Sequence, residues 1–594
     1  MINHRVRSRS LPMAGLGRPS HRSLATALAL VLVSGTSALA QTPLPADVKQ
    51  TCTVSNGEIS GWFESGSIAP NGAVLPANSL TFTPNSLCSF YKWSAQMFLW
   101  RTSPALARYG GGSHVFDSPV FYAVSPPNAN GQRTLVPNSS GVPINFLPFI
   151  TQVGRVGQEV VTDNTGKLHN VIHPAVGPNN RILLNNRAGQ QVEIESIEAA
   201  PDGKPVLLDR ERKPIEAQAG PAGAPTLLSA NGGIISLRPN TVIVNGRPRL
   251  ITTTGEVVVP PEEGQAGGGG ALMSTQNKSL VYYLIQVNDV WGYFLTGVKD
   301  LKIGNPTPTA FPADGASLGQ VESFAQNTPP PNTKPFFPDA DAIVVEVKSS
   351  WIETTNLVNA NQYVTITATV PTYNPPLTQA NLTQATQNGT KTTQLALVGM
   401  HVVGTVLNHP EMIWATFEHI NNAPNTSYTY LINNGTKTQP ADGPGGWTFS
   451  ATGSAGSNNQ ERMKASGNTI TALSGQTIGP SNVGRINPWG TASNDAAFTA
   501  NNTDLVSINR SVLGQLANGD IRKNYIQTGS TWVLGGQPPS TGTITGTPEM
   551  SNTTMETFHQ GSNCFDCHSD PPMLGSPGGG GLSHVWGPAL PLFN

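Results

Sequence analysis

Large apolar residues recur at steps of three and four along residues 87–100. Phe90, Trp93, Met97 and Trp100 fall on one side of a helical projection of this stretch, and this spacing predicts an amphipathic helix. A row of aromatic side chains on a helix is most often part of a protein core, and we expect that role here. The alternative is that the helix forms a wall of a cofactor pocket.

Short runs rich in Val, Ile, Leu and Thr follow further along the chain and predict β-strands. They cover residues 279–287, 342–347, 363–370, 395–406 and 412–420, with a turn expected around Leu407 to Glu411. Residues 435–480 are rich in Gly, Ser, Asn and Thr, which predicts a long surface loop. The expected fold is mainly β with a few helices: a β-rich core plus a short helical segment at the C-terminus.

Residues 150–270 have a pattern of their own. Short apolar pieces alternate with polar Gly/Asn/Asp turns, and they start at steps of roughly twenty residues, as in a degenerate repeat. Pro260-Pro261 and the glycines at 267–270 end the stretch as a flexible linker. We predict a β-hairpin-rich insertion, and we expect His169 and His173 on its surface rather than as ligands.

The first forty residues have the features of a secretory signal. Five arginines precede the apolar stretch 24–33 (LATALALVLV), and Ala38-Leu39-Ala40 precedes Gln41 as a small-x-small cleavage site. Translation would start at Met1 or Met13. The apolar stretch is too short for a stable membrane span, and no later run is long enough, so we expect a mature chain without one.

The predicted organisation follows from these boundaries. A signal peptide (1–40) precedes a core domain whose first section (41–149) and second section (271–545) are separated by the insertion (150–270). A C-terminal segment (546–594) completes the chain.

Charge limits the choice of partner. Without residues 1–40 the chain keeps 29 basic and 35 acidic residues. Nucleic-acid binding depends on a basic surface, as does electrostatic binding to acidic lipid, so we expect neither. Glycine and proline are frequent, with 62 and 50 residues, which favours turns and short strands.

The chain has four cysteines, and Cys52 and Cys88 are the two outside the C-terminal segment. In an oxidising compartment we expect them to form a disulfide. A reactive thiol pair is the alternative, but neither cysteine has a basic neighbour in sequence that would activate it.

The most specific motif of the chain is Cys564-Phe565-Asp566-Cys567-His568. A Cys-x-x-Cys-His sequence is the attachment site of a c-type haem. Cys564 and Cys567 would bind one haem covalently, and His568 would be the proximal iron ligand. A zinc site would need a second pair of ligands at close spacing, and a thioredoxin-like dithiol would need a βαβ context, so both alternatives are weaker.

The segment 546–594 is shorter than a stand-alone cytochrome domain, so we expect it to dock against the β-rich body. Candidates for the distal iron ligand are His584, His401 and His419. Met555, His559 and Met573 lie close to the motif in sequence, which makes the opposite side of the haem hard to reach. In one strand register His401 would oppose His419 directly, whereas a slip of one residue would separate them. Ordinary hydrogen-bonded histidines are the alternative.

Several stretches together resemble a group of secreted bacterial mono-haem c-type cytochrome-like proteins with one C-terminal CxxCH motif. The stretches are 91–100 (YKWSAQMFLW), 344–351 (VVEVKSSW), 398–404 (VGMHVVG), 414–424 (WATFEHINNAP), 563–568 and 582–585. The resemblance implies haem binding and no particular substrate, and it does not extend to residues 150–262.

Three functions remain open at this stage. The first is a periplasmic or secreted bacterial c-type haem protein that transfers electrons, or the electron-accepting part of an oxidoreductase system, with an unidentified redox partner or substrate. The second is an enzyme that acts on peroxide, oxygen or an organic substrate at an open iron. The third is a sensory or binding protein. A 500-residue body is large for a bare electron carrier, whereas a single CxxCH argues against the dihaem peroxidase plan. Whether the protein is an enzyme is therefore left open.

Overall fold

The structure, a computed structural model, describes residues 44–593 apart from several short stretches. The positions left out are 129, 149–159, 164–166, 177–180, 210–212, 221–224, 230–232, 245–246, 260–269, 305, 329–333, 452–458, 474, 491–494, 540, 551, 559, 562, 567, 569–572 and 575–580. The predicted signal peptide and Cys567 therefore lie outside the described residues.

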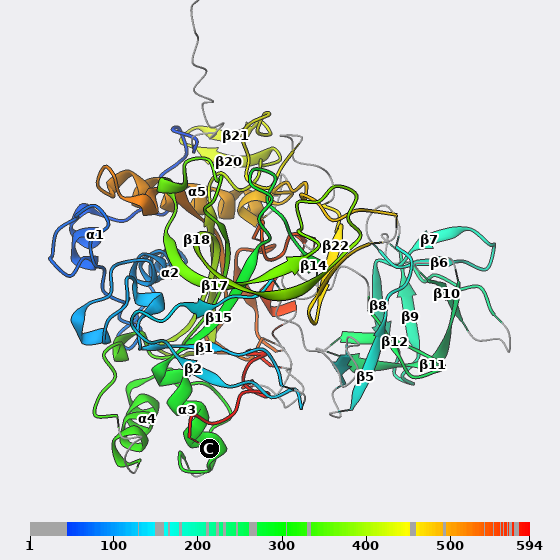
Figure 1. The fold of residues 1–594 in the computed structure, drawn as a ribbon, viewed down its shortest axis with the longest axis horizontal. Helices are drawn as coiled ribbons and strands as arrows, with labels where there is room; N and C mark the ends of the chain where they lie inside the picture. The colour runs from blue at the N-terminus through cyan, green and yellow to red at the C-terminus, as the bar shows by residue number, and fades with distance from the viewer. Residues whose placement is uncertain are drawn as a thin grey trace, which may run out of the picture. The chain divides into compact units, whose positions relative to one another are not determined.

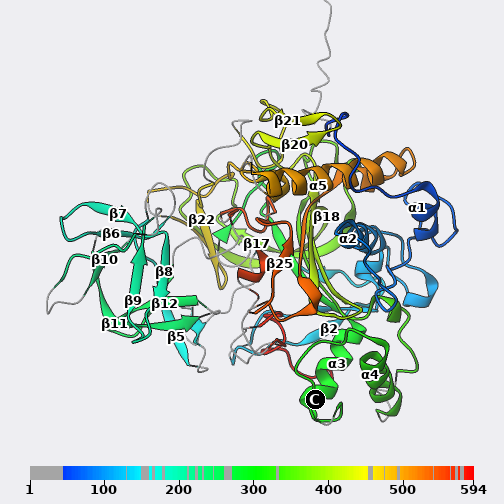
Figure 2. The same cartoon turned by 180° about the vertical axis from the view of Figure 1, so that it is seen from behind.

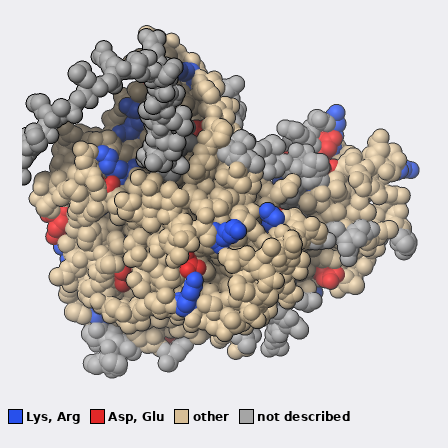
Figure 3. Space-filling model, turned by 45° about the horizontal axis from the view of Figure 1, so that its top comes forward, with Lys and Arg blue, Asp and Glu red and all other residues tan. Residues whose placement is uncertain are grey.

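Strands dominate the described chain (Figures 1 and 2), which confirms the mainly β fold with few helices. The helices are α1 (Asn56–Trp62), α2 (Cys88–Arg101), α3 (Asp289–Lys299), α4 (Gly315–Asn327) and α5 (Ala496–Gln515). None of the helices in the described residues is both long and apolar enough to cross a membrane. Charged side chains are few on the face shown in Figure 3, in keeping with a chain in which 12% of residues are charged.

Thirteen strands form the central sheet. They are β1 (Phe121–Val124), β2 (Leu135–Pro137), β3 (Ile144–Asn145), β14 (Gly270–Ala271), β15 (Tyr282–Asn288), β16 (Val345–Glu353), β17 (Thr365–Asn374), β18 (Gln384–Val406), β19 (His409–His419), β22 (Met463–Ser466), β23 (Thr469–Ala472), β24 (Tyr525–Val533) and β25 (Ile544–Gly546). The five predicted strands correspond to β15–β19, although β16, β17, β18 and β19 are longer than expected. The predicted turn is also present: Val406 pairs with His409, and Asn408 has a left-handed φ of 64° that asparagine tolerates well.

Some strands of this sheet close into a ring. Hydrogen bonds join β15 to β16, β16 to β18, β18 to β17, and β17 to β3. Two residues beyond β3, the N–H of Tyr283 donates to the carbonyl of Leu147 at 2.6 Å, which links the chain back to β15. Inside this ring of strands, the side chains of Phe146 and Trp351 meet edge to face, with their aromatic centroids 5.7 Å apart. The ring therefore has an apolar inner face and a separate outer face.

The apolar face of the sheet continues from the ring onto β19 and β24, where it packs against α2 and α5 in the largest apolar cluster. Phe98 of α2 stacks on Phe417 of β19 with ring centroids 4.5 Å apart. Phe90 stacks on Trp532 of β24 at 4.1 Å. Helix α2 is therefore a core-packing helix, and it is buried on more sides than an amphipathic pattern implies.

The disulfide between Cys52 and Cys88 is present, with Cα atoms 5.3 Å apart. Cys88 is the first residue of α2, and the N–H of Cys52 donates to Ser507 Oγ of α5 at 3.1 Å. The bond therefore fixes the start of α2 beside α5. On the chain-entropy model a loop of this length contributes roughly 3–4 kcal/mol.

The prediction of one long loop over residues 435–480 is wrong. β21 (Gly435–Gln439) pairs with β20 (Tyr428–Ile432), and β22 and β23 form a hairpin that joins β18. Met463, Ala465 and Ile470 are buried on one side of this hairpin, and Gly467 has a positive φ in its turn. Their alternation is hidden in the sequence by the surrounding Ser, Thr and Asn residues.

Residues 160–259 contain the hairpins expected there. Their strands are β4 (Val160–Thr162), β5 (Leu168–Ile172), β6 (Leu183–Asn185), β7 (Gln191–Glu193), β8 (Ser196–Ala199), β9 (Pro205–Leu208), β10 (Thr226–Leu228), β11 (Ile234–Val244), β12 (Arg247–Thr252) and β13 (Val257–Val258). Within the described residues, their apolar clusters include no residue from outside this region. The domain boundaries stay a prediction.

The expectation of a surface His169 is wrong. Its side chain is buried, its Nε2 lies 2.7 Å from Asp163 Oδ2, and its Nδ1 lies 3.1 Å from the Gly255 carbonyl. His173 is half-buried, with its Nδ1 2.9 Å from the carbonyl of Val259. The carboxylate and carbonyl partners explain why a histidine is accommodated inside this small β region.

Candidate functional site

The outer face of the central sheet carries polar and charged side chains on β16, β18 and β19. In the strand register Lys348 of β16 lies opposite His401 of β18, and His401 lies opposite Thr416 of β19. Glu346 and Ser350 flank Lys348 on the same face because side chains alternate along a strand. A row of polar groups therefore crosses the middle of the sheet.

The C-terminal segment covers this row, as its short length led us to expect. Ser350 Oγ and Thr554 Oγ1 lie 2.6 Å apart, and Asn552 donates to Thr416 Oγ1 at 3.1 Å. Further along, Ser583 donates to Glu346 Oε2 at 2.6 Å. The polar row is thus paired with polar groups of the segment instead of facing water.

Apolar and backbone contacts hold the end of the segment on α3. Trp586 meets Trp291 and Phe294 of α3 with ring centroids 5.5 and 5.4 Å apart. Lys299 Nζ donates to the Gly587 carbonyl at 3.0 Å, and burial lowers the pKa of this lysine to about 8. The segment is therefore anchored on both sides of the CxxCH motif.

The motif itself forms a tight turn. Residues Cys564–Asp566 form one turn of 3-10 helix. This turn is all the helical structure among the described residues of 546–594. The N–H of His568 donates to the carbonyl of Cys564 at 3.0 Å, so the two residues are one helical turn apart and their side chains project to the same side. Phe565 between them is buried and meets the Trp414 ring at 5.9 Å.

His568 has a defined hydrogen-bond partner. Its Nδ1 lies 2.7 Å from the backbone carbonyl of Leu582, which can only accept, so Nδ1 carries the proton. Burial lowers the pKa of His568 well below its usual range, and the neighbouring His584, Lys348 and His401 act in the same direction. The imidazole is therefore neutral, with its lone pair on Nε2, the form that binds a metal.

His584 is the distal candidate that the structure brings to His568. The two imidazole rings are stacked, with centroids 4.0 Å apart and planes inclined by 17°. The Trp414 ring lies 4.4 Å from the ring of His568. Two histidines and one indole are thus gathered at the motif.

His401 lies on the same outer face, and its imidazole is engaged by a carboxylate. Its Nε2 lies 2.9 Å from Glu556 Oε1. Burial acts to raise the pKa of Glu556, but His401 and Lys348 overcome this effect and leave that pKa lowered. Burial lowers the pKa of Lys348 and raises that of Glu346 to about 7. The outer face is therefore a set of ionisable groups with little water around them.

His419 lies apart from this group. It is on the inner face, stacked on Tyr363 at 3.8 Å, and burial lowers its pKa to about 3. His401 does not oppose it, because the register pairs His401 with Thr416 and His419 with Tyr525. Glu418, the next residue, faces outward and pairs with Arg485 at 2.7 Å.

The described residues around the motif include groups that a c-type haem would use. A thiol and an imidazole lie on one side of a single turn, the imidazole has its Nε2 lone pair available, and a second histidine lies next to it. Apolar side chains surround them, namely Trp414, Phe565, Leu574, Leu582, Val585 and Trp586. Among the described residues no group of three or more His, Cys, Asp or Glu side chains is placed to hold a metal ion.

Sequence reasoning missed Glu346, Lys348 and Glu556 as members of this site. One signal was present: in Val345-Glu346-Val347-Lys348 a charged residue follows each apolar one. This pattern places both charges on one face of a strand, but it does not reveal what covers that face.

No family model, curated protein or solved structure matches the chain.

Proposed function

We propose that this chain is a periplasmic or secreted bacterial mono-haem c-type protein that transfers electrons or accepts them within an oxidoreductase system. The observation that carries the proposal is the geometry of His568. Its backbone is one helical turn from Cys564, and its Nδ1 proton is directed at the Leu582 carbonyl. A histidine held in this way presents Nε2 to a metal.

Each residue of the turn then has a role. Cys564 and Cys567 would form the two thioether bonds, and His568 would bind the iron. His584 is the preferred second ligand because it is the distal candidate in contact with His568, and the two stacked rings would have to separate to admit an iron between their nitrogens. Bound haem supplies a one-electron redox centre. With two histidine ligands the iron would have no open position, which would favour electron transfer over catalysis at the metal. The disulfide between Cys52 and Cys88 supports an oxidising compartment.

The first test concerns covalent attachment. The full chain is produced together with a haem-maturation system and examined for haem that survives a denaturing gel. We expect haem on the wild-type chain and its loss in Cys564→Ala and Cys567→Ala. The double variant Cys52→Ala/Cys88→Ala is the matched control, and it should keep haem. If the control lost haem while Cys564→Ala and Cys567→Ala kept it, the assignment would be contradicted.

The second test concerns the second ligand. Optical spectra of the reduced protein are recorded with and without carbon monoxide. We expect no response from the wild type, a clear response from His584→Ala and none from His173→Ala, a half-buried histidine of the β-hairpin region. A response from the wild type would instead indicate an open iron and favour the enzymatic alternative.

A further inference from the structure

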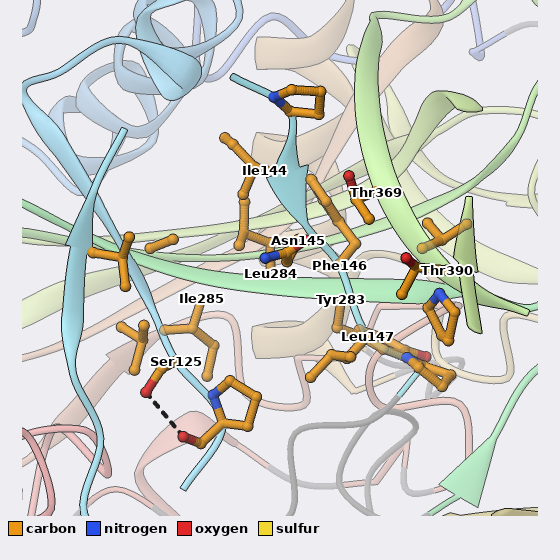
Figure 4. A pocket seen from close by; sticks show the side chains of 18 of the residues that line it. Ser125, Ile144, Asn145, Phe146, Leu147, Tyr283, Leu284, Ile285, Thr369 and Thr390 are labelled. Atoms are coloured by element: carbon orange, nitrogen blue, oxygen red, sulfur yellow. Dashed lines mark hydrogen bonds between the residues drawn. The ribbon is translucent and has the colours of Figure 1, made fainter. Parts of the chain in front are cut away.

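A large pocket opens on the outer side of the ring where β3 meets β15 (Figure 4). Its volume is about 820 Å³, within the range of roughly 300–1,000 Å³ that is usual for small-molecule sites. The described lining comes from residues 123–128, 136–139 and 142–148 and from β15 and β17, with contributions from Gln387, Thr390, Gly467 and Asn468. No residue of 546–594 belongs to this described lining.

The strand register places the polar side chains of the pocket floor on one face. Thr369 of β17 is paired with Asn145 of β3. Thr390 of β18 is paired with Pro371, which lies two residues after Thr369 and so faces the same way. Figure 4 shows Asn145, Thr369 and Thr390 from three neighbouring strands around the same space.

The pocket has no charged side chain in its described lining. Much of it is apolar: Ala123, Val124, Val136, Val142, Ile144, Leu147, Tyr283 and Ile285. Two of these side chains, Val136 and Val142, are 49% and 64% exposed, so a ligand would remove apolar surface from water. An ion would lose its hydration here without gaining an opposite charge, which strongly disfavours a charged ligand.

Proline is frequent in the lining. Six lining residues are prolines: Pro126, Pro127, Pro137, Pro143, Pro148 and Pro371. Each has a fixed φ and no N–H, so the backbone at these positions is stiff and offers carbonyl acceptors in place of N–H donors. A stiff lining lowers the entropy cost of binding.

Hydrogen-bonding groups remain available on the floor. In the described structure the side chains of Asn145, Thr369 and Thr390 make no hydrogen bond, whereas the hydroxyl of Ser125 donates to the Pro126 carbonyl at 2.9 Å. An amide and two hydroxyls in an otherwise apolar pocket can orient a molecule that carries a hydroxyl group.

We propose that this pocket binds a neutral, mainly apolar organic molecule that carries a hydroxyl group, such as an aromatic alcohol or a phenol. This inference goes beyond the proposed function and does not depend on haem binding. The phenol of Tyr283, whose ring lines the pocket, donates to the Thr554 carbonyl at 2.8 Å. The ligand would therefore lie beside the strand that also holds the C-terminal segment.

The test uses calorimetry with 1-naphthol as the neutral probe and 1-naphthoate as its charged counterpart, on the full mature chain. We expect saturable binding of one 1-naphthol per chain, and binding of 1-naphthoate that is weaker by at least about tenfold. Absence of saturable 1-naphthol binding, or equal binding of both probes, would overturn the proposal.

Two tryptophan variants locate the site. Thr369→Trp fills the pocket and should weaken 1-naphthol binding by at least about tenfold. Thr367→Trp is the matched control, since Thr367 lies on the same face of β17 but is exposed and outside the lining. Unchanged binding in folded Thr369→Trp would overturn the assignment. If this variant does not fold, Asn145→Ala/Thr390→Ala should weaken binding by about two- to tenfold, and no effect there would overturn it equally.

Discussion

The two faces of β16, β18 and β19 are built from alternate residues of the same strands, yet they are covered in different ways. Val347, Met400 and Phe417 face inward and join the apolar cluster that includes α2 and α5. Lys348 and His401 face outward and meet the C-terminal segment. One face buries aromatic surface, and the other pairs ionisable groups beside the CxxCH turn.

This difference shows that alternation of apolar and polar residues along a strand does not always mean that one face of the sheet is exposed to solvent. Apolar-polar alternation usually indicates an antiparallel sheet with its polar side in water. Here Ser350, Thr416 and Glu418 on the polar side are completely buried, and partners in the C-terminal segment or Arg485 satisfy them. We infer that the inner face mainly supplies stability and that the outer face mainly positions the motif.

The largest loss of stability is expected from a substitution on the inner face. Phe98→Ala removes a ring that is 3% exposed and stacked on Phe417, and such a change lowers the free energy of unfolding by about 3–5 kcal/mol. Phe336→Ala is the matched control, because Phe336 is 59% exposed. Urea unfolding curves of both variants provide the measurement. Equal midpoints would contradict the assignment of stability to this face.

Loss of the disulfide should have the next-largest effect on the free energy of unfolding. Cys52→Ala/Cys88→Ala frees the start of α2 from the segment before α1, and we expect a loss of about 3–4 kcal/mol in the free energy of unfolding. A reducing agent should lower the stability of the wild type and leave that of the variant unchanged. A similar sensitivity of both proteins to the reductant would point to another source of the effect.

Removal of a buried charge next to the outer face should lower the free energy of unfolding by a comparable or somewhat smaller amount. In the wild type the side chains of Arg485 and Glu418 are 6% and 0% exposed. Arg485→Met therefore leaves the Glu418 carboxylate buried without its cationic partner. Breaking a buried pair from one side lowers the free energy of unfolding by about 3 kcal/mol.

Arg187→Met is the matched control, since its pair with Glu216 is 83% and 74% exposed and should contribute less than about 1 kcal/mol. Urea unfolding measures both variants. If Arg485→Met were no more damaging than Arg187→Met, the polar contacts next to the outer face would not be structural.

The smallest effect is expected away from both faces, at the start of α4. Asp314 Oδ1 accepts from the Ser317 N–H at 2.7 Å, so Asp314→Ala should lower stability by about 1 kcal/mol. This hydrogen bond lowers the pKa of Asp314. Its contribution is therefore present above the ordinary aspartate pKa of about 4 and is lost as the pH falls through the lowered value.

Asp314→Asn keeps an acceptor but cannot titrate. The stability advantage of the wild type over Asp314→Asn should shrink on acidification below about pH 4. Thermal unfolding of both proteins at several pH values measures this change. A difference that does not vary with pH would rule out the carboxylate as its source.

Local patterns predicted much of this fold. The helix at 88–101, the five central strands, the turn at Asn408 and the disulfide follow from spacing or residue type. Helix α5 was missed because its sequence is rich in Asn, Ser and Thr, which are poor helix formers. Helix α3 was also missed, although ten of its eleven residues are buried.

The candidate site was only partly predictable. The CxxCH motif is local, and His584 could be proposed because it follows within the same segment. The contacts of Glu346 with Ser583 and of His401 with Glu556 join residues more than 150 positions apart. They depend on the register of β16 and β18 and on the path of the C-terminal segment, and no short sequence pattern specifies either.

The most direct test of the central claim is a count of covalent haem. The mature chain is purified after production with a haem-maturation system, and its haem is measured per mole of protein by the reduced pyridine adduct after extraction of non-covalent haem. We expect one covalent haem per chain. A chain that carries none, under conditions that mature a control cytochrome, would contradict the assignment of the Cys564–His568 turn as a haem site.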